Sequence, residues 1–304
     1  MVVHDMRREL PRTLASLSPA YQRNIDVDDY EVIVVDNGSA EPVDPRLIAG
    51  FEGRIRSLRL DPAPASPARA ANEGIRAAAG DLVGLIVDGA RMASPGLLAT
   101  ARLGARLSAR PVVATAGWHL GDHRHMQAAE VGHDQDAEDA LLASVDWFAD
   151  GYRLFGISTL AGSSGRGWFG PMGESSALFL PAGSWADLGG LDEAFALPGG
   201  GLVNHDLYRR ACTAPGAQLV VLLGEGTFHQ FHGGAATSGR FGQDEMRADY
   251  VMLRGAPYRP PECEPLYVGR LPLAALGHLE ASAELARERA RRAGVEPPRR
   301  PVPG

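Results

Sequence analysis

The decapeptide YEVIVVDNGS, residues 30–39, is the most informative stretch of this sequence. Its run of Val and Ile predicts a strand over residues 31–36, and the following Asn-Gly-Ser is a turn sequence. Such a strand delivers Asp36 to the carboxyl edge of an open α/β sheet, where ligands bind. Asp36 there can accept hydrogen bonds from a ribose hydroxyl or a base N–H. The alternative is an aspartate that only caps its own turn.

Strands and helices alternate on both sides of this stretch. We expect strands at Val2–Val3, 55–60, 82–88, 112–117, 176–181 and 218–223, and helices at 10–17, 70–79, 97–107, 202–212 and 273–293. Alternation through the first 117 residues indicates βαβ units. The predicted fold is therefore α/β, with a Rossmann-like, mainly parallel central sheet flanked by helices and a C-terminal helical extension.

The middle of the chain breaks this alternation. Residues 137–148 predict an amphipathic helix whose Leu141, Leu142, Val145 and Phe148 face inward. Residues 162–173 are rich in Gly and Ser, and we expect a mobile loop that carries Trp168 and Phe169 as aromatic surface. We expect the stretch from residue 119 to 150, which contains this helix, to be an inserted or lid-like element.

Composition excludes several classes of protein. The net charge of −7 in 304 residues argues against a nucleic-acid binder. Apolar runs such as residues 82–87 fall short of the roughly 18 residues that span a bilayer, and the start does not resemble a secretory signal. Cys212 and Cys263 fit neither a disulfide framework nor a zinc finger. We expect a cytoplasmic protein without a transmembrane segment.

Two further segments carry polar groups to the same region. LVGLIVDGARMASP, residues 82–95, places Asp88 at the end of a buried strand, and a carboxylate there is a hard oxygen ligand for Mg²⁺ or Mn²⁺. ARAANEGIRAAAGD, residues 68–81, places Arg69 and Asn72 near a helix start, where they could meet a nucleotide. An ordinary solvated helix start is the alternative.

Histidines gather in two places. In GEGTFHQFHGG, residues 224–234, His229 and His232 lie between glycines behind a strand, as a metal or lid site would require. His119, His123, His125 and His133 lie close to Asp122 and Asp134, but their spacing fits a closed four-ligand zinc site poorly. For this second group we expect an acceptor-facing or solvated loop.

Taken together with GGLDEAFALPGGGLVNHDLYRR at residues 189–210, the order of these segments resembles family 2 glycosyltransferases of the GT-A fold. The resemblance covers residues 1–235 except 119–170. It implies a glycosyltransferase-like domain at 1–240, with a nucleotide-binding half at 1–117 and an acceptor-side half at 118–240. Residues 241–304 would be an extended segment and a helix, with Leu273, Leu276, Leu279 and Leu285, that packs on the domain or forms a homodimer.

The resemblance also implies an activity: transfer of a sugar from a nucleoside-diphosphate-sugar donor to a hydroxyl acceptor, which could be a sugar, a lipid-linked sugar or a small metabolite. His4 and Asp5 would flank the base, while Asp36 and Asn37 would bind the base or ribose. Arg69 and Asn72 would line the nucleotide, and Asp88 would hold Mn²⁺ or Mg²⁺ on the diphosphate.

Two departures from the family pattern matter. Its paired metal aspartates become Asp88-Gly89-Ala90, so a histidine would complete the site, and we favour His232 over His229. Its catalytic Glu-Asp pair becomes Val203-Asn204, and an asparagine cannot act as a general base.

Three mechanisms therefore stay open: Asp206 as the base, Glu174 as the base, or a retaining transfer that needs none. The absence of the second metal aspartate and of the Glu-Asp pair also allows a second class of function, a catalytically impaired nucleotide-sugar-binding or scaffold protein. A nucleotidyltransferase ranks last, because Met6-Arg7-Arg8 lacks the glycines of a triphosphate loop.

Overall fold

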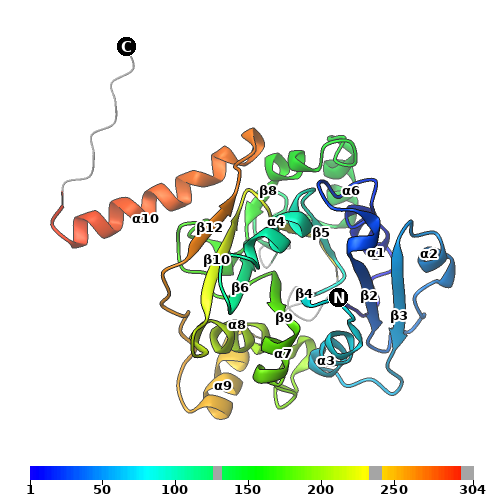
Figure 1. Ribbon diagram of the computed structural model, residues 1–304. Coiled ribbons are helices and arrows are strands. Elements are labelled where there is room, and N and C mark those ends of the chain that lie inside the picture. Colours follow the sequence, from blue (N-terminus) through cyan, green and yellow to red (C-terminus); the bar gives the residue numbers. More distant parts are fainter. Residues whose placement is uncertain (126–131, 233–241, 296–304) are drawn as a thin grey trace.

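The computed structural model describes residues 1–125, 132–232 and 242–295 (Figure 1). The elements of the first half are β1 (Val2–Val3), α1 (Leu10–Ser16), β2 (Glu31–Asp36), α2 (Pro45–Ala49), β3 (Arg54–Arg59), α3 (Ala68–Ala77), β4 (Leu82–Ile86), β5 (Arg91–Ala93), α4 (Leu97–Gly104), β6 (Pro111–Thr115) and β7 (Gly117–Leu120). Those of the second half are α6 (Gln135–Ala143), β8 (Ser158–Leu160), β9 (Ala177–Pro181), α7 (Ala182–Leu188), α8 (Val203–Thr213), β10 (Gln218–Leu223), β11 (Thr227–His229), α9 (Gln243–Arg254), β12 (Leu266–Gly269) and α10 (Leu279–Arg292).

The central sheet has the order β12-β10-β6-β9-β4. β12, β10 and β6 are parallel, and β9 runs antiparallel to both of its neighbours. A second, all-parallel sheet has the order β1-β2-β3, and the Gly89 N–H donates to the Val2 carbonyl oxygen (2.8 Å), which joins it to the chain after β4. The predicted mainly parallel α/β fold is confirmed.

A third, four-stranded sheet has the order β5-β11-β7-β8. Three of its four strands follow a strand of the central sheet along the chain: β5 follows β4, β7 follows β6, and β11 follows β10. β11 pairs antiparallel with β5 and parallel with β7. This small sheet therefore brings the segments after three central strands together, on the side where the ligand site was predicted.

The core fills both faces of the central sheet. Successive strand residues point to opposite faces, so Val113 packs in one buried cluster while its neighbours Val112 and Ala114 pack in the other. β10 alternates in the same way. Continuous apolar strands such as residues 219–222 are thus explained by burial on both faces.

Two expectations about the middle of the chain are wrong. Trp168 is fully buried, because it packs against Trp118 with ring centroids 5.2 Å apart, so the Gly/Ser-rich loop presents only Phe169 as exposed aromatic surface. Phe148 is 48% exposed, because α6 ends at Ala143 and no longer directs the side chain inward.

The C-terminal segment is part of the fold. β12 adds an edge strand beside β10, and α9 precedes it; neither element was expected in the segment that was predicted to be extended. The predicted last helix begins as a 3₁₀ turn at Leu273–His278 and continues as α10, which projects from the body in Figure 1. None of the helices within the described ranges is long and apolar enough to cross a membrane.

Candidate functional site

Hydrogen bonds join the residues that follow β1 to the residues that follow β2. His4 Nδ1 lies 3.0 Å from the carbonyl oxygen of Asn37, the Asp5 N–H donates to Ser39 Oγ (3.0 Å), and the Ala40 N–H donates to Asp5 Oδ1 (2.8 Å). These bonds hold Asp5 at a left-handed φ of 52°. The side chains of His4 and Asp5 remain 60% and 54% exposed, so they can meet a ligand.

Asp36, by contrast, is turned inward and is 1% exposed. Its Oδ1 accepts the Ser39 N–H (2.8 Å) and its Oδ2 accepts the Arg59 guanidinium (2.6 Å). Burial by itself raises its pKa, but these hydrogen bonds and the Arg59 charge outweigh burial and lower it. The arrangement matches the turn-capping alternative, which leaves Asp36 to shape the loop on which the neighbouring Asn37 lies.

Asn72 joins α3 to the GGLDE segment. Its Nδ2 donates to the Leu191 carbonyl oxygen (2.9 Å) and to Glu193 Oε1 (3.0 Å), while its Oδ1 accepts the Leu191 N–H (2.8 Å). At Gly190, where φ is 72°, a Cβ would lie 2.4 Å from Asn72 Oδ1. The close approach explains the glycine, and it shows that the Asn72 amide is already engaged within the protein.

Arg69 has an exposed side chain at the mouth of a cavity of about 200 Å³. The cavity is lined by Pro64, Ser66, Ala68, Arg69, Glu193 and Ala196. It lies between the start of α3 and the GGLDE segment, so it joins the two predicted halves. It is smaller than the roughly 300–1,000 Å³ typical of pockets that enclose a small molecule, and it would hold only part of a ligand.

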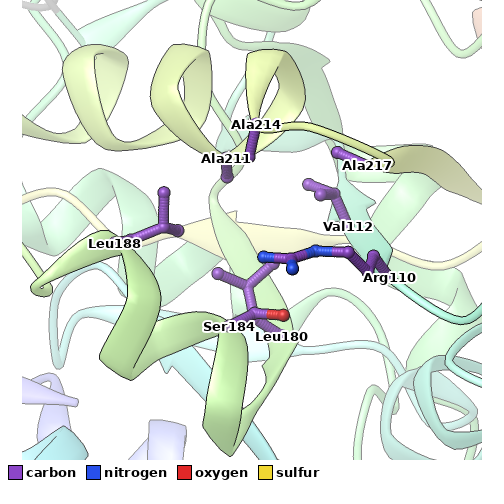
Figure 2. A pocket seen from close by; sticks show the side chains of 8 residues that line it. All are labelled: Arg110, Val112, Leu180, Ser184, Leu188, Ala211, Ala214 and Ala217. Atoms are coloured by element: carbon purple, nitrogen blue, oxygen red, sulfur yellow. The ribbon is translucent and has the colours of Figure 1, made fainter.

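Figure 2 shows a second hollow, between α7, α8 and the start of β6. Its volume is about 10 Å³, and Arg110 and Leu188 are among its lining residues. At the opposite end of the strands from Asp88, it has room for about one water molecule. It is not a candidate ligand site.

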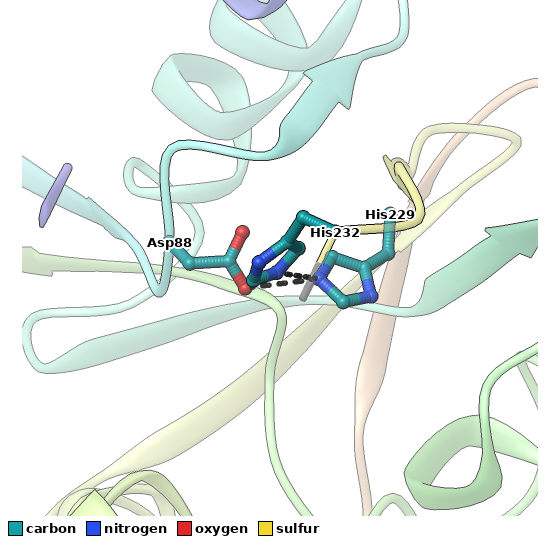
Figure 3. Close-up of side chains that lie close together, drawn as sticks. All are labelled: Asp88, His229 and His232. Carbon is teal, nitrogen blue, oxygen red and sulfur yellow. Dashed lines mark hydrogen bonds and ion pairs between the residues drawn. The ribbon is translucent and has the colours of Figure 1, made fainter. Parts of the chain in front are cut away.

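The clearest group of metal-ligating side chains is Asp88, His229 and His232 (Figure 3). His229 Nε2 lies 3.4 Å from Asp88 Oδ2 and 3.1 Å from His232 Nε2. Asp88 follows β4, and His229 ends β11. Ligand-type atoms of all three residues lie within 4.8 Å of one another, so the donor set fits a divalent cation.

The backbone around Asp88 is tightly packed. A Cβ at Gly89 would lie 2.2 Å from Val3 Cγ1, so β1 can approach only a glycine. Ala90 is fully buried, and its N–H donates to Asp88 Oδ1 (2.9 Å). Arg91 stands opposite His229 in the β5–β11 ladder, and its Nε lies 3.1 Å from Asp88 Oδ2. Ala90 therefore offers no ligand atom, and the groups that accompany Asp88 are the imidazoles of His229 and His232.

The described histidines between residues 119 and 133 are partly or fully buried, so the solvated-loop alternative is wrong. His125 is 1% exposed, and its ring centroid lies 5.2 Å from that of His229. Burial lowers the pKa of His119 to about 2 and that of His125 to about 3, and it lowers that of His229 well below its usual value. These imidazoles are therefore neutral near pH 7, with lone pairs for a cation.

Glu174 lies at the same edge of the sheet, just before β9, whose first residue Ala177 pairs with Ile86 of β4. Its Oε2 is 3.6 Å from Nδ1 of His205, which lies in the first turn of α8. The Tyr258 hydroxyl donates a hydrogen bond to the carbonyl oxygen of Gly173, the residue before Glu174. Burial, reinforced by the Glu174 charge, raises the pKa of Tyr258. A partly exposed carboxylate thus lies beside His205, the residue that directly follows Asn204.

Asp206 occupies a different environment. It is 1% exposed and accepts hydrogen bonds from Arg210 Nε (2.8 Å) and Arg254 Nε (2.6 Å). Arg254 also binds Asp192 (2.7 Å), so the network joins α8, α9 and the GGLDE segment. Burial raises the pKa of Asp206, but the two guanidiniums outweigh it and lower the pKa. A buried, twice-paired carboxylate with a lowered pKa is poorly suited to take a proton, which weighs against Asp206 as the base.

Several residues at this site were missed or underrated from sequence. Arg91 and His205 were not considered, and His229 was ranked below His232. Two sequence features could have pointed to these residues. One is the alternation of side chains along residues 88–91, and the other is the position of His205 directly after Asn204. Which strand end meets which, however, depends on the β5–β11 pairing.

Comparisons with known proteins agree with this fold. The family model Glycosyl transferase family 2 matches residues 1–89. A crystal structure of TarS from S. aureus is similar over 83% of this chain but only 42% of its own, at 12% identity and a TM-score of 0.50, so the chain spans less than half of that protein's length.

Two structures of TarS residues 1–349 give TM-scores of 0.52. The complex with UDP is 12% identical and covers 97% of this chain and 74% of its own. The complex with UDP-GlcNAc is 13% identical and covers 95% and 72%. No curated protein matches the chain in sequence. Residues 1–89 thus match glycosyl transferase family 2, and the chain has the GT-A fold of glycosyltransferases.

Proposed function

We propose that this protein transfers a sugar from a nucleoside-diphosphate-sugar donor to a hydroxyl acceptor. The observation that carries the proposal is the convergence of Asp88, His229 and His232 beside the rim formed by His4 and Asp5. The family match over residues 1–89 supports it, as do the TarS complexes with UDP and UDP-GlcNAc. UDP is accordingly the first nucleotide to test.

In this proposal His4, Asp5 and Asn37 contact the base and ribose, and Arg69 contacts the diphosphate or sugar. Asp36 and Asn72 hold these residues in place through the hydrogen bonds described above. Asp88, His229 and His232 would hold a divalent cation, which supplies positive charge beside the departing diphosphate. Two imidazoles and one carboxylate favour Mn²⁺ over Mg²⁺, because Mg²⁺ prefers oxygen ligands.

For the acceptor side we propose Glu174 as the general base, with His205 beside it. The acceptor oxygen attacks the anomeric carbon, the bond from that carbon to the diphosphate oxygen breaks, and the acceptor proton passes to Glu174. The partly exposed position of Glu174 supports this role over Asp206, whose oxygens are engaged by two arginines. Asp206 as base and a retaining transfer without a base are the competing mechanisms.

A second candidate function is a nucleotide-sugar-binding or scaffold protein. The observation that favours it is Asn204 at the family's base position together with the buried Ala90. The two functions share the donor site and differ in turnover. Nucleotide binding without release of free UDP in the presence of candidate acceptors would favour the scaffold.

The test is thermal unfolding with UDP, GDP, dTDP, CDP and ADP, each with and without Mn²⁺. A nucleotide present at 100 times its Kd should add about 2.7 kcal/mol to the free energy of unfolding. We expect one nucleotide to stabilise the protein mainly with Mn²⁺, and Asp88→Asn to remove this effect. Asp122→Asn, at a fully exposed carboxylate, is the matched control. Absence of a response to every nucleotide would contradict the proposal.

A further inference from the structure

We propose that His125, His133 and Glu138 form a second metal site, separate from the Asp88 group, which binds a divalent first-row transition ion such as Zn²⁺. Each residue offers a ligand-type atom, and these atoms lie within 4.8 Å of one another. Glu138 is in the first turn of α6, and Asp134 caps this helix by accepting the Ala137 N–H (2.9 Å). The site therefore forms where the loop after β7 meets the start of α6.

The distances suit a compact ion. Nε2 of His125 and Nε2 of His133 lie 3.9 and 4.0 Å from Oε2 of Glu138. Ligands about 2.0–2.1 Å from a tetrahedral Zn²⁺ are roughly 3.3 Å apart, so each imidazole nitrogen must approach the carboxylate oxygen by only about 0.6–0.7 Å. The donor set of two imidazoles and a carboxylate is one that Zn²⁺ accepts, with an open position for water.

Burial without partners is the second observation. The side chains of His125 and Glu138 are fully buried, and that of His133 is 8% exposed. Among the described residues, His133 Nε2 is buried with no hydrogen-bond partner. His125 Nε2 lies 3.1 Å from the Leu120 carbonyl oxygen, a contact that metal binding at this atom would replace. A buried polar atom without a partner destabilises the folded state. An ion bound at His133 Nε2 would give that atom a partner.

The carboxylate of Glu138 is already oriented for this role. Its Oε1 lies 3.3 Å from Arg8 NH1, and its Oε2 accepts the Phe231 N–H (2.5 Å). Such outer contacts are typical of the groups that orient metal ligands. The positive charge of Arg8 is also shared with Asp139 and Glu9, so Glu138 is not fully compensated by it.

The proposed second site would stabilise the region around His229, a member of the Asp88 group. The ring centroid of His125 lies 5.8 Å from that of His133 and 5.2 Å from that of His229. An ion on His125 and His133 would fix the His125 ring beside His229 of β11. It would thus stabilise the protein without touching a nucleotide, so its presence can be tested independently of the proposed function.

The test measures bound metal in an Asp88→Ala background, which removes the carboxylate of the donor site. The protein is stripped with EDTA, reloaded with Zn²⁺, dialysed and analysed by mass spectrometry of the metal. We expect about one equivalent of Zn²⁺ in Asp88→Ala, and less than about a tenth in Asp88→Ala combined with Glu138→Gln or His133→Ala. Asp136→Asn, on the exposed face of α6, is the matched control and should keep the metal.

The zinc-dependent rise in unfolding temperature should follow the same pattern. Circular dichroism checks that each variant is folded. If His133→Ala does not fold, the near-isosteric Glu138→Gln carries the test. Loss of all zinc from Asp88→Ala would overturn the proposal, as would full zinc retention in the double variant with Glu138→Gln. Failure of nucleotide binding alone would leave this proposal standing, because no nucleotide enters the measurement.

Discussion

Glu174 differs from Asp206, the other candidate base, in its partial exposure and its imidazole neighbour. We predict that Glu174→Gln lowers kcat by roughly 100-fold to 10,000-fold, the usual contribution of a general base. UDP affinity with Mn²⁺ should not change, because Glu174 does not lie in the Asp88 group.

Steady-state release of UDP and thermal shifts measure the two effects separately. Asp187→Asn, an exposed carboxylate on α7, is the control. Full turnover in Glu174→Gln would show that the base is assigned wrongly and would favour a transfer without one.

Asp206 should act on stability. Its folded pKa is lowered below the ordinary 3.8, so its contribution is fully present above pH 3.8 and is lost as the pH falls through the folded value. We predict that Asp206→Asn lowers the free energy of unfolding by about 2 kcal/mol at pH 7, less than for a fully buried pair because Arg210 and Arg254 are partly exposed.

The deficit relative to wild type should shrink below pH 4 in urea titrations at several pH values. Asp192→Asn, at the more exposed end of the network, should cost less. An equal deficit at pH 3 and pH 7 would contradict the assigned ion pairs.

At the scale of elements, β1 positions Asp88 by packing on Gly89. We predict that Gly89→Ala destabilises the protein by about 1–3 kcal/mol, because the new Cβ would collide with Val3. Nucleotide affinity should fall as well, since β1 also carries His4 and Asp5 to the rim. Urea unfolding and thermal shifts with UDP and Mn²⁺ are the measurements.

Gly183→Ala in α7 is the matched control. A Cβ there meets no heavy atom within 4 Å, so alanine should stabilise the helix by about 0.5–1 kcal/mol. Should Gly89→Ala unfold and bind as wild type does, β1 is not seated as described.

At the scale of the whole molecule, the C-terminal segment completes the core. Ala275 is fully buried, His278 Nε2 lies 2.9 Å from the Phe155 carbonyl oxygen, and β12 covers the edge of β10. We predict that a chain ending at residue 264 unfolds at lower urea and aggregates, because the apolar β10 becomes an open edge.

Size-exclusion chromatography and urea titration test this. Leu273→Ser, at a side chain that is 87% exposed, should leave both unchanged. A shortened chain as stable as the full one would show that the segment is dispensable.

The sequence by itself determined the elements whose signals are local. β2 was predicted with its observed bounds, and α3, α4 and α8 within a few residues, because strand and helix periodicities and turn residues act over short distances. The order of motifs also indicated the family 2 resemblance and the GT-A fold, which the comparisons support.

Only the tertiary structure decided which distant residues and strands contact one another. Asp206 meets Arg254 across 48 residues, and Asp88 meets His229 through the β5–β11 ladder. β12 is a strand because β10 offers it an open edge, while its own sequence is too short and exposed to signal one. Pairing of distant segments depends on which surfaces pack together, and local sequence patterns do not encode that choice.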